Sequence, residues 1–383
     1  MAANADRSGA GRAPGHHRPE ADGPRQARAV RRDCPSPASV RQAGPHSLGG
    51  SSDDPVGRGA AGRAPGRSQA GPHPLGGSPD DPVGRGAARN PAGLSPIVAG
   101  AWRLAEWGWT PQQRLAWIEG NLDLGVTSFD HADIYGGYSV EALFGEALAL
   151  RPALRAHLQL VSKCGIQLVM PARPGVAAAT QVKHYDTSSA HVRASVERSL
   201  QALRTDHLDL LLIHRPDALT DFDELADTFE ALRREGKVRC FGVSNFAPHQ
   251  LAPLHRRIAL ATHQIELSPL HLDALHDGVL DQCQDLGLRP MVWSPLAGGR
   301  LFTADDERAR RLRATLEPMA AALGVSVTTL VIAWVLRHPS QPLPILGSRR
   351  IEVARDAMAA CALRLNAQQW WRVWTAATGH EVP

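Results

Sequence analysis

Short apolar runs alternate with amphipathic stretches from Pro96 to the end of the chain. The apolar positions of the stretches lie three and four residues apart, which is the helical period. Eight of the runs are predicted to be strands: Ile97–Ala99, Thr127–Phe129, Leu158–Ser162, Leu208–Ile213, Val238–Val243, Thr262–Glu266, Arg289–Trp293 and Leu343–Leu346. Helices are predicted at Gln112–Leu124, Val140–Leu150, Ser189–Leu203, Phe222–Glu235, Gly278–Leu286 and Val327–Leu336, and from near Ile351. The alternation indicates βαβ units with parallel strands.

Eight strands joined by helical crossovers of one hand close naturally into a barrel. A doubly wound open sheet is the competing fold, but it favours a GxGxxG turn after its first strand, and the sequence has none there. We therefore predict an α/β protein, a (β/α)₈ TIM barrel, over residues 94–383.

Residues 1–93 have a different composition, and we expect them to form a disordered tail. The segment 44–66 recurs at 71–93 with a period of 27 residues, and both copies are rich in Gly, Pro, Ala and Arg. Segments so poor in aromatic and β-branched residues bury too little apolar area to offset the entropy of ordering. Arginines in the tail alternate with Asp-Asp pairs, so we expect no nucleic-acid-binding arm.

Charge and cysteine content narrow the class of protein. Residues 1–92 hold thirteen Arg against eight acidic residues, so the positive charge of the chain belongs to the tail. The five cysteines lie far apart with no CxxC pair, which fits a reducing cytoplasm and no disulfide framework. Because no apolar run approaches the length of a membrane helix and no signal peptide is present, we expect a cytoplasmic protein without a membrane partner.

Polar residues at the ends of three predicted strands are the candidates for catalysis. In a barrel, catalytic groups project from the carboxyl ends of the strands. The segment SFDHADIYGG places Asp130 at such an end and Tyr135 five residues later, VSKCG places Lys163, and LDLLLIHRPD places His214.

These four side chains suit the protonation of a carbonyl oxygen. The ordinary pKa of a tyrosine is about 10, and a nearby ammonium such as that of Lys163 lowers it by stabilising the phenolate. Asp130 would keep Lys163 protonated, and His214 would hydrogen-bond the substrate oxygen. Because no Ser or Cys with an adjacent base supplies a nucleophile, a hydride from a cofactor is the natural reactant.

The motifs DxADxYG, VSKCG, LIHRPD and GVSNF, in this order and spacing, make the chain resemble the aldo-keto reductases over about residues 96–383. Within that family, DHADIYGGY, SKCGI, DHLDLLLIHRPD and the closing QQWWRVW resemble the YdhF-type bacterial oxidoreductases. The resemblance implies that Asp130, Tyr135, Lys163 and His214 form the catalytic tetrad, with Tyr135 as general acid in carbonyl reduction.

The resemblance also implies a site for NADPH, with NADH as the alternative cofactor. Ser244, Asn245 and Gln264 would hold the nicotinamide carboxamide, and Trp293 would stack on the ring. ILGSRR precedes a helix whose first N–H groups suit a phosphate, and Ser348 and Arg349 are candidates for the 2′-phosphate. The remaining candidates for cofactor binding are Ser294, Pro295, Leu296, Gly298, Gly347 and Asp356.

The sequence departs from the family pattern at two places. Val353 stands where a basic or amide residue is common, which weakens the preference for NADPH over NADH. No clear β-hairpin precedes Leu94, where many members of the family close the bottom of the barrel.

The substrate is expected to be a small carbonyl compound. Trp102 and Arg103 would line its pocket, and specificity would depend on the loops near Trp102–Thr110, Val169–His184 and Gly298–Arg308. The sequence decides neither the substrate nor the oligomeric state.

Two other functions stay open. A cofactor-binding regulatory subunit, similar to the potassium-channel β-subunits, would share the fold, and a Schiff-base aldolase would use Lys163 as nucleophile. A metal site at Asp130, His131 and Asp133 is disfavoured because neighbouring side chains on a strand point to opposite faces, so no metal is expected.

Overall fold

The computed structural model describes residues 90–169 and 180–383. The predicted disordered tail lies outside the described residues, apart from its last four, residues 90–93. Asn90 begins the described chain, and its side-chain amide bonds to both the backbone N–H and the carbonyl oxygen of Leu94.

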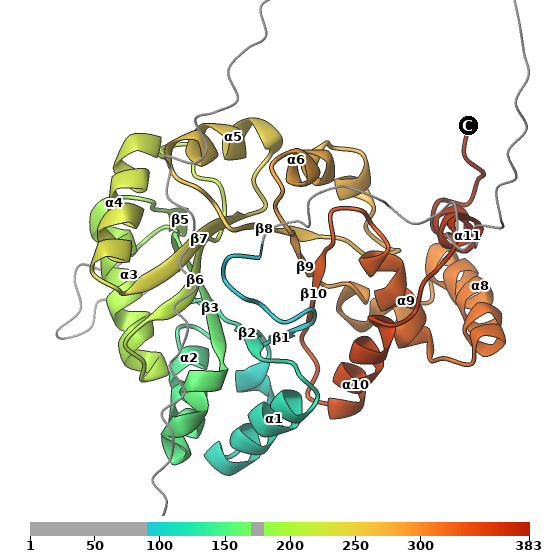
Figure 1. The fold of residues 1–383 in the computed structure, drawn as a ribbon, viewed down its shortest axis with the longest axis horizontal. Coiled ribbons are helices and arrows are strands. Elements are labelled where there is room, and N and C mark those ends of the chain that lie inside the picture. The colour runs from blue at the N-terminus through green and yellow to red at the C-terminus, as the bar shows by residue number, and fades with distance from the viewer. Residues whose placement is uncertain (1–89, 170–179) are drawn as a thin grey trace, which may run out of the picture. The chain divides into compact units, whose positions relative to one another are not determined.

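Eight parallel strands close into a barrel, which confirms the predicted fold (Figure 1). Each predicted strand is present: β6, β8 and β10 have the predicted bounds, and the bounds of the other five differ by one or two residues. The strands are β1 (Val98–Gly100), β2 (Ser128–Asp130), β3 (Gln159–Cys164), β6 (Leu208–Ile213), β7 (Val238–Ser244), β8 (Thr262–Glu266), β9 (Met291–Trp293) and β10 (Leu343–Leu346). Closure comes from β1, which pairs with both β2 and β10.

A short antiparallel pair, absent from the sequence prediction, follows β3. It consists of β4 (Ile166–Gln167) and β5 (His184–Tyr185), which flank the loop that contains the undescribed residues 170–179. Two-residue strands carry no periodic signal, so the apolar pattern could not have revealed them.

Helices surround the strands in Figure 1. They are α1 (Pro111–Asp123), α2 (Val140–Leu150), α3 (Ser189–Leu203), α4 (Phe222–Arg234), α5 (Pro248–Arg257), α6 (Val279–Asp285), α7 (Arg300–Thr303), α8 (Glu307–Leu323), α9 (Val327–Leu336), α10 (Ile351–Ala360) and α11 (Ala367–Thr378). Several begin at side-chain caps, as at Thr110, Ser188 and Asp221, whose oxygens accept from the free N–H groups of the first turn.

Two apolar clusters fill the structure. The larger lies between the strands and the helices. The smaller joins Val98, Val161 and Leu210 of three strands with Leu94, and Ala92 packs against it. The segment before β1 thus contributes apolar side chains to this cluster, and residues 90–97 themselves form no strand.

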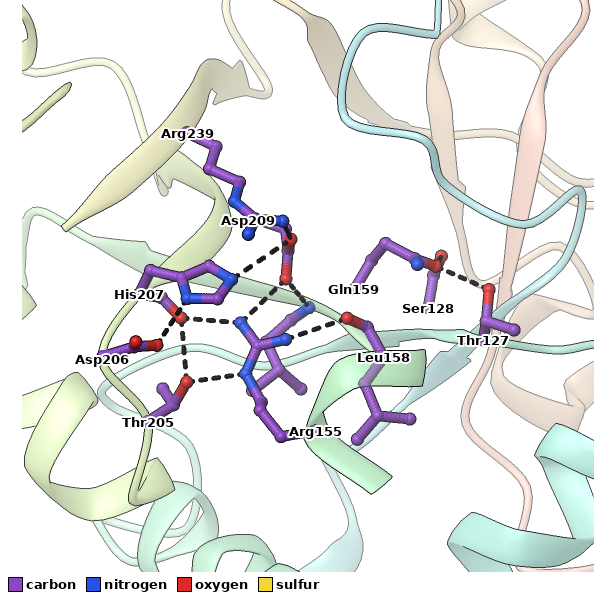
Figure 2. A network of polar contacts seen from close by, with 11 residues as sticks. Thr127, Ser128, Arg155, Leu158, Gln159, Thr205, Asp206, His207, Asp209 and Arg239 are labelled. Carbon is purple, nitrogen blue, oxygen red and sulfur yellow. Dashed lines mark hydrogen bonds and ion pairs between the residues drawn. The ribbon is translucent and has the colours of Figure 1, made fainter. Parts of the chain in front are cut away.

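A buried ion cluster ties together the N-terminal ends of β3, β6 and β7 (Figure 2). Asp209 accepts hydrogen bonds from Arg155 at 3.0 Å, from Arg239 at 2.8 Å and from the N–H of Leu160 at 2.9 Å. Burial alone would raise the pKa of Asp209, but these donors and His207 outweigh it and hold the pKa below its usual value. In barrels this end serves stability and the opposite end serves function.

Among the helices of residues 90–169 and 180–383, none is by itself long and apolar enough to cross a membrane. One pair bent by 96°, Glu307–Ala322 with Val327–Leu336, reaches that length and composition when the two helices are taken together.

Candidate active site

The four predicted catalytic residues lie at one rim of the barrel. Asp130 ends β2, Lys163 is the penultimate residue of β3, and His214 follows β6 directly. Tyr135 lies in the loop after β2, where its N–H donates to the carbonyl oxygen of Ala132 in a tight turn. Because parallel strands end at the same rim, residues from distant parts of the sequence converge there.

Lys163 is the centre of this group. Its Nζ atom donates to Asp130 Oδ2 at 2.7 Å, to the carbonyl oxygen of His131 at 2.7 Å and to the hydroxyl of Tyr135 at 3.1 Å. The Lys163 side chain is fully buried. Burial by itself would lower the pKa of Lys163, but the charge and hydrogen bond of Asp130, with those of Tyr135, raise it above its usual value. Lys163 is therefore an ammonium with all three donors used.

Tyr135 differs from the sequence expectation in one respect. The charge of Lys163 does lower the pKa of its phenol, but burial outweighs this effect and the net pKa is raised. The prediction that Lys163 brings the phenol below its ordinary pKa is therefore wrong for this structure. Tyr135 keeps its proton at neutral pH, and because an ammonium only donates, the Tyr135 O–H proton is available to another acceptor.

His214 is a neutral imidazole beside Tyr135. The two rings meet edge to face with centroids 5.9 Å apart. Burial and the charges of Lys163, Arg215 and Lys183 lower the pKa of His214 to about 2. Its Nδ1 atom has no hydrogen-bond partner among the described residues. A neutral imidazole in this position can donate one N–H to an oxygen bound next to Tyr135.

Gln264 connects this group to the predicted carboxamide site. Its Nε2 atom donates to Asp130 Oδ1 at 2.8 Å, which fixes the orientation of the amide because a carboxylate only accepts. Trp293 Nε1 donates to Asn245 Oδ1 at 3.1 Å, and Asn245 Nδ2 reaches Ser244 Oγ at 2.7 Å. Asn245 has a φ of 59°, a left-handed conformation that asparagine tolerates better than most residues.

A cavity of about 750 Å³ runs from this group to the start of α10. Most of the predicted site residues line it: Trp102, Arg103, Asp130, Tyr135, His214, Gln264, Trp293, Ser294, Pro295, Leu296, Gly298, Gly347, Ser348 and Asp356. Ser294 has a φ of 51° and Gly298 a φ of 65°, so the loop after β9 is held in a left-handed conformation along the cavity wall.

Four predicted site residues do not line this cavity: Lys163, Ser244, Asn245 and Arg349. Lys163 does not line the cavity itself, and its Nζ atom contacts the hydroxyl of Tyr135, which does. Ser244 is buried and touches Asn245, which lines a smaller neighbouring cavity together with Trp293. Arg349 is exposed and does not line the large cavity, whereas Arg350, the residue before α10, does.

Lys183, Arg215, Phe302 and Arg350 also line the cavity and were not predicted as individual site residues, although Lys183 and Phe302 lie in two of the loops predicted to set specificity. Arg215 follows His214 in LIHRPD, and its place after a strand end was a usable signal. Lys183 belongs to the long loop before β5, whose conformation no sequence pattern determines.

His131 and Asp133 do not join Asp130 to form a metal site. His131 is completely buried with its ring against Phe144, and burial lowers its pKa to about 3. Over residues 90–169 and 180–383, no group of three or more His, Cys, Asp or Glu side chains is placed to hold a metal ion.

Asp133 belongs to a buried polar cluster outside the barrel wall. Among the described residues, neither carboxylate oxygen of Asp133 has a hydrogen-bond partner of ordinary geometry, and Glu141 lies near enough to repel its charge. Burial, with that repulsion, raises the pKa of Asp133 to about 7. Glu141 accepts a hydrogen bond from Ser162 Oγ at 2.5 Å.

The fold and the rim geometry agree with comparison to known families. The model of the aldo/keto reductase family matches residues 96–376, so the chain belongs to this family of oxidoreductases, and the predicted resemblance is confirmed.

Two relatives and one solved structure illustrate the similarity of the chain to known proteins. The chain is 52% identical to the oxidoreductase YdhF of Escherichia coli over 76% of its length and 95% of that protein. It is 43% identical to a 6-dehydroglucose reductase of Agrobacterium fabrum, over 76% of this chain and 96% of that one. Among solved structures, an aldo/keto reductase of Klebsiella pneumoniae in complex with NADP and acetate is similar, with a TM-score of 0.59 and 29% identity over 73% of this chain and 90% of the other.

Proposed function

We propose that this protein reduces an aldehyde or ketone to an alcohol with NADPH, and that Tyr135 is the general acid. The observation that carries the proposal is the chain of contacts from Asp130 through Lys163 to Tyr135, with Tyr135 and His214 both lining one cavity. This arrangement supplies a proton donor and a second hydrogen-bond donor for one oxygen atom.

The residues of the cavity fit a nicotinamide dinucleotide. Asp130 holds the Gln264 amide with its Nε2 toward the carboxylate, which leaves the Gln264 oxygen free to accept from a carboxamide N–H. Ser348 and Arg350 adjoin the first turn of α10, whose unpaired N–H groups attract phosphate. A reduced nicotinamide, when bound, supplies hydride to a carbonyl carbon. NADP rather than NAD follows from the Klebsiella relative and from Arg350, and NADH remains the alternative cofactor.

The protein's own contribution is to hold the carbonyl oxygen and protonate it. Tyr135 donates its O–H proton to the oxygen as negative charge develops there. Lys163 stays charged and stabilises the phenolate that results, and neutral His214 donates a second hydrogen bond.

The alternatives are less well supported. A Schiff-base lysine needs a neutral amine, whereas Asp130 and Tyr135 raise the pKa of Lys163 and occupy its donors. A purely regulatory cofactor-binding subunit has no need for a tyrosine and a histidine that face the same cavity.

Replacement of Tyr135 tests the proposal. Tyr135→Phe removes the acid and retains the ring, and we expect kcat to fall by roughly 10²–10⁴-fold. Quenching of protein fluorescence by NADPH should be unchanged, because the carboxamide and phosphate residues are intact. Tyr138→Phe is the matched control, since the Tyr138 hydroxyl bonds to the Leu168 N–H at a different place. Equal turnover by Tyr135→Phe and wild type would refute the mechanism.

A further inference from the structure

The half of the cavity nearest Tyr135 and His214 is rich in positive charge. Arg103, Lys183 and Arg215 line it, from the loop after β1, the loop before β5 and the loop after β6. They are separate from Arg350, which adjoins α10 at the other end, beside Ser348.

Arg215 is close to the reacting groups. Its Nη1 atom donates to the carbonyl oxygen of His214 at 3.1 Å, so the guanidinium folds back beside the catalytic imidazole. Its charge lowers the pKa of both Tyr135 and His214, although burial has the larger effect on each. Since one hydrogen bond to a carbonyl uses only one of five donors, Arg215 retains donors for another partner.

Lys183 and Arg103 complete the group from other loops. Lys183 is exposed and close enough to His214 for its charge to lower the pKa of the imidazole. Arg103 lies over the ring of Trp102, with its Cζ atom 5.4 Å from the centroid, and Nη2 donates to the Gly298 carbonyl oxygen at 3.3 Å.

These three cations have no ion pair with a carboxylate on the described part of the chain. Within residues 90–169 and 180–383, no carboxylate oxygen lies within 4.0 Å of Arg103, Lys183 or Arg215, whereas arginines such as Arg114, Arg155 and Arg257 each have one. The charge of Arg215 does act on Glu266 at the end of β8, where it lowers the pKa of the carboxyl while burial has the larger and opposite effect. Of the carboxylates that line the cavity, Asp130 is bonded to Lys163, and Glu352 and Asp356 belong to α10. Cations that line a cavity without a carboxylate paired to them attract an anion and steer it toward the site.

We propose that the substrate is an anionic carbonyl compound, whose carboxylate or phosphate group is bound by Arg215 and Lys183 while its carbonyl group lies at Tyr135 and His214. The inference rests on the proposed function and adds the substrate class. The reaction is unchanged: the carbonyl carbon gains hydride from the reduced nicotinamide, the oxygen gains the Tyr135 proton, and the anionic group passes through unaltered.

Matched substrates test the proposal with the full-length protein and NADPH. Succinic semialdehyde is compared with butanal, and glyceraldehyde 3-phosphate with glyceraldehyde, so the two pairs distinguish a carboxylate from a phosphate. We expect kcat/KM to be at least tenfold higher for the anionic member of one pair, since hydrogen bonds to charged groups carry about that much. The advantage should shrink as ionic strength rises.

Substitutions test whether Arg215 and Lys183 cause the preference for the anionic substrate. Arg215→Gln and Lys183→Gln should each reduce the ratio of kcat/KM for the anionic substrate to that for its neutral partner by about tenfold. Arg215→Lys keeps the charge and should restore most of the ratio, while Arg310→Gln, on an exposed side chain of α8, should leave it as in the wild type.

The outcomes separate this inference from the proposed function. Equal kcat/KM for charged and neutral partners in both pairs, with turnover still dependent on Tyr135, would overturn the anionic substrate and leave the reductase intact. A ratio that Arg215→Gln and Lys183→Gln do not change would also overturn it. Turnover of both pairs that survives Tyr135→Phe would instead refute the reductase mechanism.

Discussion

Two buried basic side chains at the rim of the barrel differ in protonation state because their surroundings differ. Lys163 and His214 are both buried at the rim, and burial opposes charge on each. Lys163 has a carboxylate at 2.7 Å and keeps its proton, whereas His214 faces only cations and loses it. The site therefore holds one fixed positive charge and one neutral donor, which suits an oxygen that becomes negative during the reaction.

Asp133 should make the stability of the protein fall as pH rises. Its pKa is about 7 in the folded state against an ordinary value of 3.8, so the folded protein binds the proton more tightly than the unfolded chain. The stabilisation by this proton is complete below pH 3.8 and is lost as pH rises to about 7, where the buried carboxylate ionises near Glu141.

Asp133→Asn removes this titration and should flatten the dependence. The free energy of unfolding is measured by urea denaturation for the variant and for wild type. The difference, variant minus wild type, should increase by roughly 2–3 kcal/mol from pH 5 to pH 9. Asp305→Asn, at a side chain that is 90% exposed, provides the control and should follow the wild type. A constant difference between Asp133→Asn and wild type at all pH values would show that Asp133 does not hold a proton in the fold.

Among the secondary-structure elements, the eight barrel strands and the helices α1, α2, α3, α4, α6, α9 and α10 were predicted, whereas α5, α7, α8, α11 and the short pair β4 and β5 were not. Barrel strands such as β6, β9 and β10 are short, mostly apolar runs because both of their faces are buried, and such runs stand out from amphipathic helices. The strands β2 (SFD) and β8 (THQIE) hold more polar than apolar residues. The pair β4 and β5 has two residues in each strand and depends on pairing across a long loop, so it left no local pattern.

The close packing of two helices can depend on one glycine, which a pattern of hydrophobic positions does not identify. Gly145 lies within α2, and a Cβ atom built on it would be 2.0 Å from the carbonyl oxygen of Ala202 in α3. Neither backbone can yield without moving its helix. The packing of α2 on α3 therefore requires glycine, although alanine is the better helix former by about 1 kcal/mol.

We expect Gly145→Ala to lower the free energy of unfolding by about 3 kcal/mol, as overpacking against backbone does. Gly120→Ala in α1 is the matched control: its Cβ atom would meet the end of the Ile351 side chain at 3.2 Å, and a flexible side chain can shift. The control should change stability by less than about 1 kcal/mol in the same urea titration. Equal losses for the two variants would mean that α2 and α3 do not pack as closely as described.

At the scale of the whole molecule, topology explains which site residues the sequence could predict. Asp130, Lys163 and His214 follow directly from strand ends, because a closed parallel barrel brings all such ends to one rim. Arg349 and Arg350 are adjacent, and which of them faces the cavity depends on the exact start of α10, where sequence patterns are least precise. Lys183 depends on a loop conformation that only the tertiary structure provides.

We also propose that residues 94–383 form the functional domain and that residues 1–93 are dispensable for it. The family match begins at residue 96. The side chain of Asn90 forms hydrogen bonds with the backbone of Leu94, four residues away. A chain that begins at residue 90 should therefore retain the full-length kcat, KM and midpoint of thermal unfolding.

A chain that begins at residue 96 is the comparison, and we expect it to be less stable than the full-length protein. It lacks Leu94 of the inner apolar cluster and Ser95, whose Oγ atom accepts from the N–H groups of Thr127 and Ser128 at 3.1 Å each. Two buried N–H groups left without partners and one lost leucine amount to a loss of about 3 kcal/mol or more. If the chain from residue 90 were as unstable as the chain from residue 96, the domain would have to include residues of the N-terminal segment.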